Sequence, residues 1–315
     1  MSRNSILTKG AMALIFPGQG SQFVGMGADL IRDFPAAREV FQEVDESLNQ
    51  NLSALMFAGD MDELTQTQNA QPAIMAVSMA VYRVLKSEVG PSFDDFVVAV
   101  AGHSLGEYSA LCAAGVLSLA DTARLLKARG LAMAKACEKT KGGMVALLGE
   151  DLDKAAEIAK QSGVYVANDN APGQVVLSGT LDNLEQVKIL AKQANVRKVV
   201  VLPVTGAFHS PLMQNAADEM APVLAQAKFK MPIYPIYFNV TARDNQNVQE
   251  YADFLTRQIV APVRWRELIQ NINASCFVEC GPGNVLSGLV RRIRPDVETL
   301  SLGTSESIQK LLQKR

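Results

Sequence analysis

The chain has 315 residues, of which 48% are hydrophobic and 20% are charged, and its formal net charge is −2. This balance predicts a soluble enzyme with a large core and argues against a nucleic-acid-binding protein. The longest apolar runs are far shorter than the roughly 20 residues that cross a bilayer. No signal peptide is apparent before the first expected strand, so we expect a cytoplasmic protein without a membrane partner.

Cysteine and histidine usage narrows the chemistry further. The four cysteines show no Cys-x-x-Cys spacing, so we expect reduced thiols. With only two histidines in the chain, the sequence argues against a His-rich metal site.

Short apolar runs alternate with helical stretches along most of the chain. This order predicts a mostly parallel sheet with covering helices. The expected strands are Met12–Phe16, Phe96–Ala101, Pro235–Val240 and Cys276–Cys280. Three of them run into glycine-bearing loops, at residues 17–20, 102–106 and 281–283. Because ligands of open α/β sheets bind beyond the carboxyl ends of the strands, we expect these loops to share one cleft.

The second strand leads directly into Gly102-x-Ser104-x-Gly106, after which helix-forming residues follow. Glycines two residues before and after a serine allow a tight, strained turn that exposes the hydroxyl. A strand before the motif and a helix after it are typical of a nucleophile elbow. The pattern therefore predicts that Ser104 is a nucleophile.

A helix is predicted from the capping pair Ser118 and Asp121 to about Glu138. At 100° per residue, Arg129 falls on the core-facing side, among Thr122, Leu125 and Met133. A buried arginine must be paired, because an unpaired buried charge is costly. Two interpretations stay open at this point: an internal salt bridge, or a fork that receives a substrate carboxylate.

The middle of the chain has its own pattern. Residues 144–202 read as strand, helix, two strands around a turn, helix and strand. This βαββαβ order is ferredoxin-like. We predict a small domain at 141–205, inserted into a larger domain formed by 1–140 and 206–315.

A serine nucleophile needs a base, and only His103 and His209 are available. His103 is adjacent to Ser104 on a sharp turn, where neighbouring side chains point in different directions. His209 lies in a loop just after the inserted segment, and elimination favours it as general acid and base. No aspartate marks itself as a third triad member, so we consider a dyad in which a carbonyl orients the imidazole.

These features together resemble a known family, the malonyl-CoA:acyl carrier protein transacylases and the related acyltransferase domains of fatty acid and polyketide synthases. The resemblance runs nearly end to end. It is carried by motifs at Phe16–Gln22, Gly102–Glu107, Gly206–Ser210, Gln258–Trp265 and Glu279–Gly283. The family fold implied is an α/β-hydrolase-like core with a mostly parallel sheet and an inserted ferredoxin-like small domain.

The resemblance also implies roles for the matching residues. Ser104 would attack the thioester while His209 accepts its proton, and Arg129 would bind the malonyl carboxylate. The backbone N–H groups of Gln19 and Leu105 would form the oxyanion hole. The main-chain carbonyl of Gln258 would steady the histidine, which would account for the missing acid. Asn168 would line the cleft, and Phe208 resembles the malonyl-selective form of its motif.

By the same resemblance, malonyl passes from malonyl-CoA to the phosphopantetheine thiol of holo acyl carrier protein through a malonyl-serine, for fatty acid synthesis. CoA is then a substrate component, with no permanently bound cofactor and no metal. We expect a monomer. Because carrier proteins are acidic, we expect a basic docking surface. The basic residues considered are Lys188, Lys192, Arg197, Lys198, Arg291, Arg292 and Arg294.

Other functions remain open from the sequence alone. A thioesterase or lipase-like hydrolase could use the same elbow, and a non-catalytic relative could dock carrier proteins. Dinucleotide binding is disfavoured, because Gly18-x-Gly20 is followed by Phe23 where the fingerprint needs a third glycine.

Overall fold

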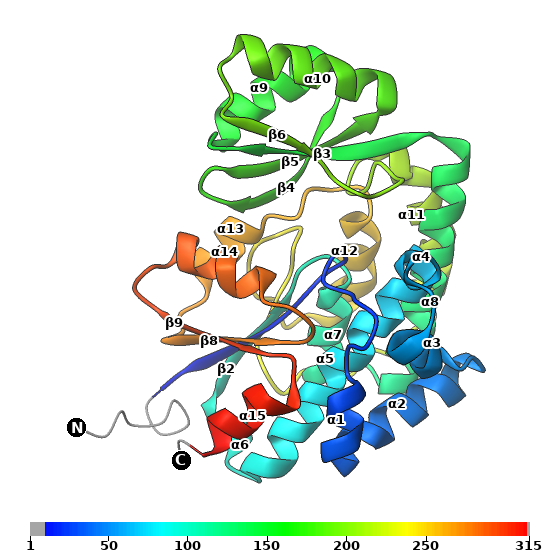
Figure 1. Ribbon diagram of the computed structural model, residues 1–315, viewed down its shortest axis with the longest axis vertical. Coiled ribbons are helices and arrows are strands. Elements are labelled where there is room, and N and C mark those ends of the chain that lie inside the picture. The colour runs from blue at the N-terminus through cyan, green and yellow to red at the C-terminus, as the bar shows by residue number, and fades with distance from the viewer. Residues whose placement is uncertain (1–9, 314–315) are drawn as a thin grey trace.

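The computed structural model describes residues 10–313 and contains two β-sheets (Figure 1). The strands are Met12–Phe16 (β1), Val97–Gly102 (β2), Gly142–Leu148 (β3), Tyr165–Ala171 (β4), Gln174–Thr180 (β5), Lys198–Val201 (β6), Ile236–Tyr237 (β7), Cys276–Cys280 (β8) and Glu298–Leu302 (β9). The larger sheet has the order β7-β2-β1-β8-β9 with every neighbouring pair parallel. The smaller sheet has the order β4-β5-β3-β6 and is antiparallel throughout.

Helices connect and cover both sheets. The α-helices before the small sheet are Ala28–Asp33 (α1), Pro35–Leu48 (α2), Leu52–Ala58 (α3), Met61–Thr65 (α4), Thr67–Val89 (α5), Phe93–Phe96 (α6), Gly106–Ala113 (α7) and Leu119–Lys139 (α8). Those within it and after it are Leu152–Ser162 (α9), Leu181–Gln193 (α10), Gln214–Ala225 (α11), Tyr251–Gln258 (α12), Trp265–Asn271 (α13), Val285–Ile293 (α14) and Ser305–Leu312 (α15). Two short 3₁₀ helices lie at Pro211–Met213 and Val248–Glu250. No helix within residues 10–313 is long and apolar enough to span a membrane.

The central strand β1 shows why the parallel sheet is stable. Its side chains alternate between two apolar layers, as strand geometry requires. Leu14 and Phe16 pack on the side of α2, α5 and α8, whereas Ala13 and Ile15 pack on the side of α13 and α14. All five residues of β1 are buried, so the strand reads as a continuous apolar run, which is typical of a sheet covered on both faces.

The small sheet packs its outer face against α9 and α10 (Figure 1). Val145 and Leu177 belong to this layer, while Met144 and Val176, one residue away along the same strands, join the main core below. Its strand order is that of a ferredoxin-like fold. The α/β class, the parallel sheet and the small antiparallel sheet predicted from the sequence are confirmed. The boundaries at 141–205 stay a prediction.

Two details of the large sheet differ from expectation. The strand expected at Pro235–Val240 pairs only over Ile236–Tyr237, and the chain then turns at Phe238–Ala242. The edge strand β9 was not predicted, because Glu298–Leu302 is half exposed and lacks an apolar run.

Candidate active site

A cavity of about 250 Å³ lies between the two sheets. The loop after β1, the elbow after β2 and helices α8 and α14 contribute to its wall from the large sheet's side. Strands β4 and β5 contribute from the small sheet. Its lining includes every side chain that the sequence singled out for the reaction, apart from Gln258 and Leu105: Gln19, Ser104, Arg129, Asn168, Phe208 and His209.

Ser104 stands on the turn between β2 and α7, at a left-handed φ of 54°. Such a backbone is strained for a residue with a Cβ, so the neighbours must allow the tight turn. A Cβ on Gly102 would lie 1.8 Å from the carbonyl carbon of Gly106, and a Cβ on Gly106 would lie 2.2 Å from the carbonyl oxygen of Phe16. Both positions therefore require glycine, and the turn has the shape of a nucleophile elbow.

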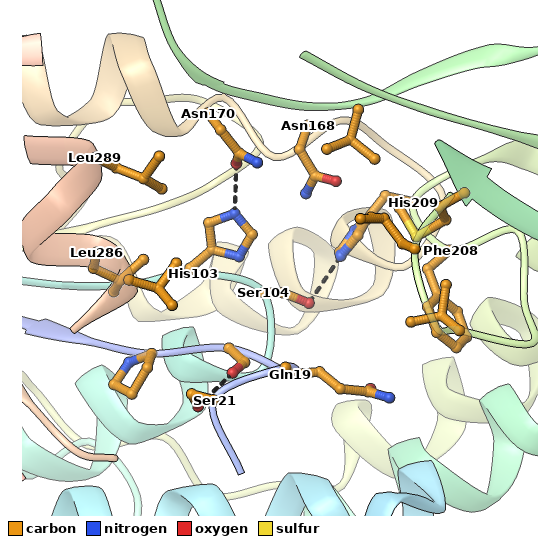
Figure 2. A pocket seen from close by; sticks show the side chains of 18 of the residues that line it. Gln19, Ser21, His103, Ser104, Asn168, Asn170, Phe208, His209, Leu286 and Leu289 are labelled. Carbon is orange, nitrogen blue, oxygen red and sulfur yellow. Dashed lines mark hydrogen bonds between the residues drawn. The ribbon is translucent and has the colours of Figure 1, made fainter. Parts of the chain in front are cut away.

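The imidazole of His209 faces this serine (Figure 2). Ser104 Oγ lies 2.8 Å from His209 Nε2. The other ring nitrogen, Nδ1, donates to the main-chain carbonyl of Gln258 at 2.8 Å. This bond leaves Nε2 unprotonated and able to accept the serine proton. A carbonyl thus occupies the place where a triad has a carboxylate.

Burial sets the proton affinity of His209. Desolvation, with the nearby positive charge of Arg129, lowers the pKa of its imidazole to about 3. The hydrogen bond to Gln258 acts in the opposite direction but is outweighed. The ring is therefore neutral at physiological pH, which is the form that a general base needs.

Arg129 is 1% exposed and reaches the same point from α8. Its Nη1 donates to Gln71 Oε1 at 2.7 Å, and its Nη2 donates to Gln258 Oε1 at 3.0 Å and to Ser104 Oγ at 3.3 Å. Within residues 10–313 it forms no ion pair, so the internal salt bridge left open by the sequence is absent. A buried guanidinium held by neutral partners alone favours an incoming anion.

The expected oxyanion donors flank the serine. Leu105 directly follows it, and Gln19 lies in the loop after β1, below Ser104 in the close-up (Figure 2). Among the described residues, neither backbone N–H is bonded to an acceptor. The Gln19 side chain is fixed by the hydroxyl of Thr67, which donates to its Oε1 at 3.2 Å. Both N–H groups are thus available for a developing oxyanion.

The remaining predicted residues complete the wall. Asn168 and Phe208 are both buried against the cavity, Asn168 from β4 and Phe208 beside the base (Figure 2). His103 is turned away from the serine hydroxyl. Its Nε2 lies 2.9 Å from Asn170 Oδ1, and its ring packs edge-on against Trp265.

One expectation about the cleft is wrong. The loop at 281–283 was expected to line it, but among the described residues the cavity is lined instead by Val285, Leu286 and Leu289 of the following helix. The loop at 281–283 packs behind the loop that follows β1. A Cβ on Gly281 would lie 2.6 Å from the side chain of Pro17 in that loop. It supports the cleft without facing it.

Sequence reasoning missed three buried polar residues of the site: Gln71, Glu107 and Asn239. Burial raises the pKa of the Glu107 carboxyl to about 8, so it is mostly neutral near pH 7. Their contacts in the site are with residues far away in the chain, Gln71 with Arg129 and Asn239 with Ser104 and Glu107, so no local pattern in the sequence indicated them.

The family assignment rests on the sequence profile as well as the geometry. A family described as "Acyl transferase domain" matches residues 13–299. The chain belongs to this family. It is 40% identical over 311 residues to the malonyl CoA-acyl carrier protein transacylase of Bacillus subtilis strain 168, covering 96% of each chain. The protein of that name from Escherichia coli K12 is 39% identical over 296 residues, covering 92% of this chain and 94% of its own.

Solved structures agree. The acyl-carrier-protein-S-malonyltransferase of Bartonella henselae superposes with a TM-score of 0.92 at 45% identity, covering 96% of this chain and 98% of its own. A malonyl-transacylase solved in complex with a type II PKS acyl carrier protein has a TM-score of 0.90 at 35% identity, covering 97% and 100%. The resemblance drawn from the motifs is confirmed.

The low pKa of His209 predicts an unusual pH profile for Ser104. We expect the rate of its labelling by a fluorophosphonate to stay nearly level from pH 8 down to pH 5, because the base remains neutral. An unperturbed imidazole would be mostly protonated at pH 5.5, and the rate would fall roughly tenfold. The rate is measured at each pH by stopping the labelling after set times and determining the labelled fraction by intact-mass spectrometry. A tenfold decline centred near pH 6.5 would contradict the pKa shift, and His209→Ala is the control that removes the base.

Proposed function

We propose that this protein transfers the malonyl group from malonyl-CoA to the phosphopantetheine thiol of holo acyl carrier protein, through a malonyl ester of Ser104, for fatty acid synthesis. The observation that carries the proposal is the buried, unpaired guanidinium of Arg129, whose Nη2 lies 3.3 Å from the Oγ of a serine paired with a histidine.

The short distance between this guanidinium and Ser104 Oγ favours an acyl group whose carboxylate lies near the reacting carbonyl. In malonyl the carboxylate carbon is two bonds from the thioester carbonyl that the serine attacks. A carboxylate so near the reacting carbon fits a cation that already contacts Oγ. It would form two parallel charge-assisted hydrogen bonds with Arg129 and remove the cost of the buried unpaired charge.

In the first half-reaction, Ser104 Oγ attacks the thioester carbonyl while His209 Nε2 takes the hydroxyl proton. The N–H groups of Gln19 and Leu105 bind the oxyanion, a contribution of roughly 3–4 kcal/mol for one such donor. When the intermediate collapses, the C–S bond breaks and the imidazolium returns the proton to the CoA sulfur. Malonyl-Ser104 and free CoA result.

The second half-reaction reverses these roles. His209 removes the proton from the pantetheine thiol, and the thiolate attacks the malonyl ester. The C–O bond to Ser104 breaks, and the proton passes from His209 to Oγ. This two-step exchange needs no metal and no permanently bound cofactor. We further propose a cytoplasmic location, in line with the four free thiols of Cys112, Cys137, Cys276 and Cys280, and a monomeric protein.

A basic surface beside the active-site cavity supports an acidic carrier as partner. A second cavity, of about 560 Å³, is lined by Arg197 just before β6, by Lys198 at the first position of β6 and by Arg292 of α14. Among the described residues its lining contains no carboxylate. Gln174 belongs to both cavities and accepts a hydrogen bond from Arg292 Nη1, so the basic surface adjoins the reaction site. Of the other basic residues considered, Lys188 and Arg294 are paired with Glu185 and Asp296.

The direct test is a transfer assay. The protein is mixed with malonyl-CoA and holo acyl carrier protein, and both proteins are weighed by mass spectrometry. We expect malonyl mass on Ser104 first and then on the carrier. Free malonate without a modified carrier would indicate a hydrolase. No modification of either protein would indicate a carrier-docking module, and either result would overturn the proposal.

Arg129→Ala is expected to lower malonyl transfer far more than acetyl transfer. Acetyl has no carboxylate, so it makes no use of the guanidinium. Sites built around such a bond discriminate by roughly 10⁴-fold, which sets the scale of the malonyl preference that should be lost. Ratios of kcat/KM for the two donors measure it. Arg124→Ala, on the exposed face of the same helix, is the matched control and should change neither. Equal losses for both donors would refute the carboxylate role.

Charge reversal of Arg197, Lys198 and Arg292 to Glu is expected to raise the KM for carrier protein at low salt, because the surface would then repel an acidic partner. The effect should shrink as salt is added. Transfer to free pantetheine, which has the thiol but no protein surface, should be unchanged. An unchanged carrier KM at low salt would remove this docking surface from the proposal.

A further inference from the structure

Asn239 ties together the two ends of the turn that carries Ser104. Its Oδ1 accepts the N–H of Ser104 at 2.8 Å, and its Nδ2 donates to the carbonyl of Gly102 at 2.7 Å. The residue is fully buried and lies two positions beyond the short strand β7, 135 residues from the serine. One carboxamide thus satisfies a donor and an acceptor on either side of His103.

The elbow needs such an external partner. A left-handed, non-glycine residue persists only where its surroundings hold it. The turn also leaves the amide of Ser104 and the carbonyl of Gly102 without their usual strand or helix partners, and unpaired buried backbone groups are costly. Because Asn239 takes the amide of Ser104, the elbow offers the next backbone N–H, that of Leu105, as its free donor at the reaction site.

The backbone of Asn239 is itself anchored to the turn that carries Ser104 and to the segment beside it. Its backbone N–H donates to Glu107 Oε2 at 2.6 Å, and its carbonyl accepts the N–H of Arg264 at 3.2 Å. Glu107 stands in the first turn of α7, three residues after Ser104, and is completely buried. These hydrogen bonds therefore connect the turn to Asn239 through Gly102 and Ser104. They connect Asn239 back to the helix after the turn through Glu107.

We infer that Asn239, held by Glu107, is a positioning residue for the reaction: it sets the backbone of Ser104 so that Oγ points at His209 Nε2 and the amide of Leu105 points at the oxyanion. Asn239 contacts neither His209 nor Arg129 through any hydrogen bond among the described residues. Its effect is on the chemical step and not on substrate binding. The inference rests on the proposed role of Ser104 as nucleophile.

The test measures the nucleophile without any acyl substrate. A fluorophosphonate labels the active serine, and intact mass gives both the final occupancy and the rate constant. We expect Asn239→Ala to reach one label per folded molecule at a rate lowered roughly 10²-fold, the scale of a misplaced reacting group. Asn271→Ala is the matched control. It removes a side-chain bond to the carbonyl of Ala242 in the same loop, without touching the elbow, and should label like the unmodified protein.

Final occupancy separates positioning from folding. If Asn239→Ala lowers the occupancy while the remaining molecules label at the normal rate, the residue is merely structural and the inference fails. Kinetics with malonyl-CoA give a second readout, in which kcat should fall while KM stays within about twofold. A rise in KM with unchanged kcat would also overturn the inference that Asn239 is a positioning residue.

Glu107 supplies a variant pair that does not depend on how Asn239→Ala folds. Glu107→Gln keeps an oxygen acceptor for the amide of Asn239, so its labelling rate should stay within about threefold of normal. Glu107→Met, similar in size but without an acceptor, should slow labelling at least tenfold. Equal rates for the two would contradict the anchoring role. Absence of label on the unmodified protein would instead overturn the proposed nucleophile, so the two failures are distinguishable.

Discussion

The geometry of the site depends on one strained turn at the end of the second parallel strand. Ser104 is held at a φ of 54°, and the glycines on either side are packed too closely for any Cβ. This places a hydroxyl at the carboxyl edge of the sheet, where a loop from a neighbouring strand supplies the Gln19 amide. The partner imidazole comes from a segment that follows the small sheet, and it meets the hydroxyl at 2.8 Å. Asn239 supports the first of these two groups through the amide of Ser104, and Gln258 supports the second through the ring of His209.

Burial is the second constraint, and it acts on three ionisable groups at once. It lowers the pKa of His209 and of Arg129 and raises that of Glu107. The histidine and the carboxyl are therefore mostly neutral at physiological pH, and Arg129 carries the local charge. Amide groups of Gln71 and Gln258 replace the counter-ion that such a cation ordinarily has. The site thus retains an unsatisfied preference for an anion, which the negative charge of an ionised aspartate in a Ser-His-Asp triad would largely remove.

Much of the fold and the chemistry could be predicted from the sequence, because local signals agree with the tertiary structure. The βαββαβ order, the Ser118 cap and the glycine spacing around Ser104 all depend on residues close together in the chain. The half-exposed edge strand β9 carried no such signal. Nor did Asn239, since its partners lie 135 and 132 residues away and only the folded sheet brings them together. The place of the loop at 281–283, behind the cleft, likewise depends on how the helix after it packs.

The same contacts link substrate choice to proton transfer. The charge of Arg129 is one of the causes that lower the pKa of His209, second to desolvation. A carboxylate bound to the guanidinium would offset that charge, and the imidazole beside it would become a stronger base. A donor without the carboxylate would leave the repulsion in place, so the histidine would be less able to take the serine proton. In the proposed reaction, selectivity would then come from two effects of one anion: its binding by Arg129 and the higher basicity that it gives His209. Gln258 supports both, because its side chain holds the arginine while its carbonyl holds the ring.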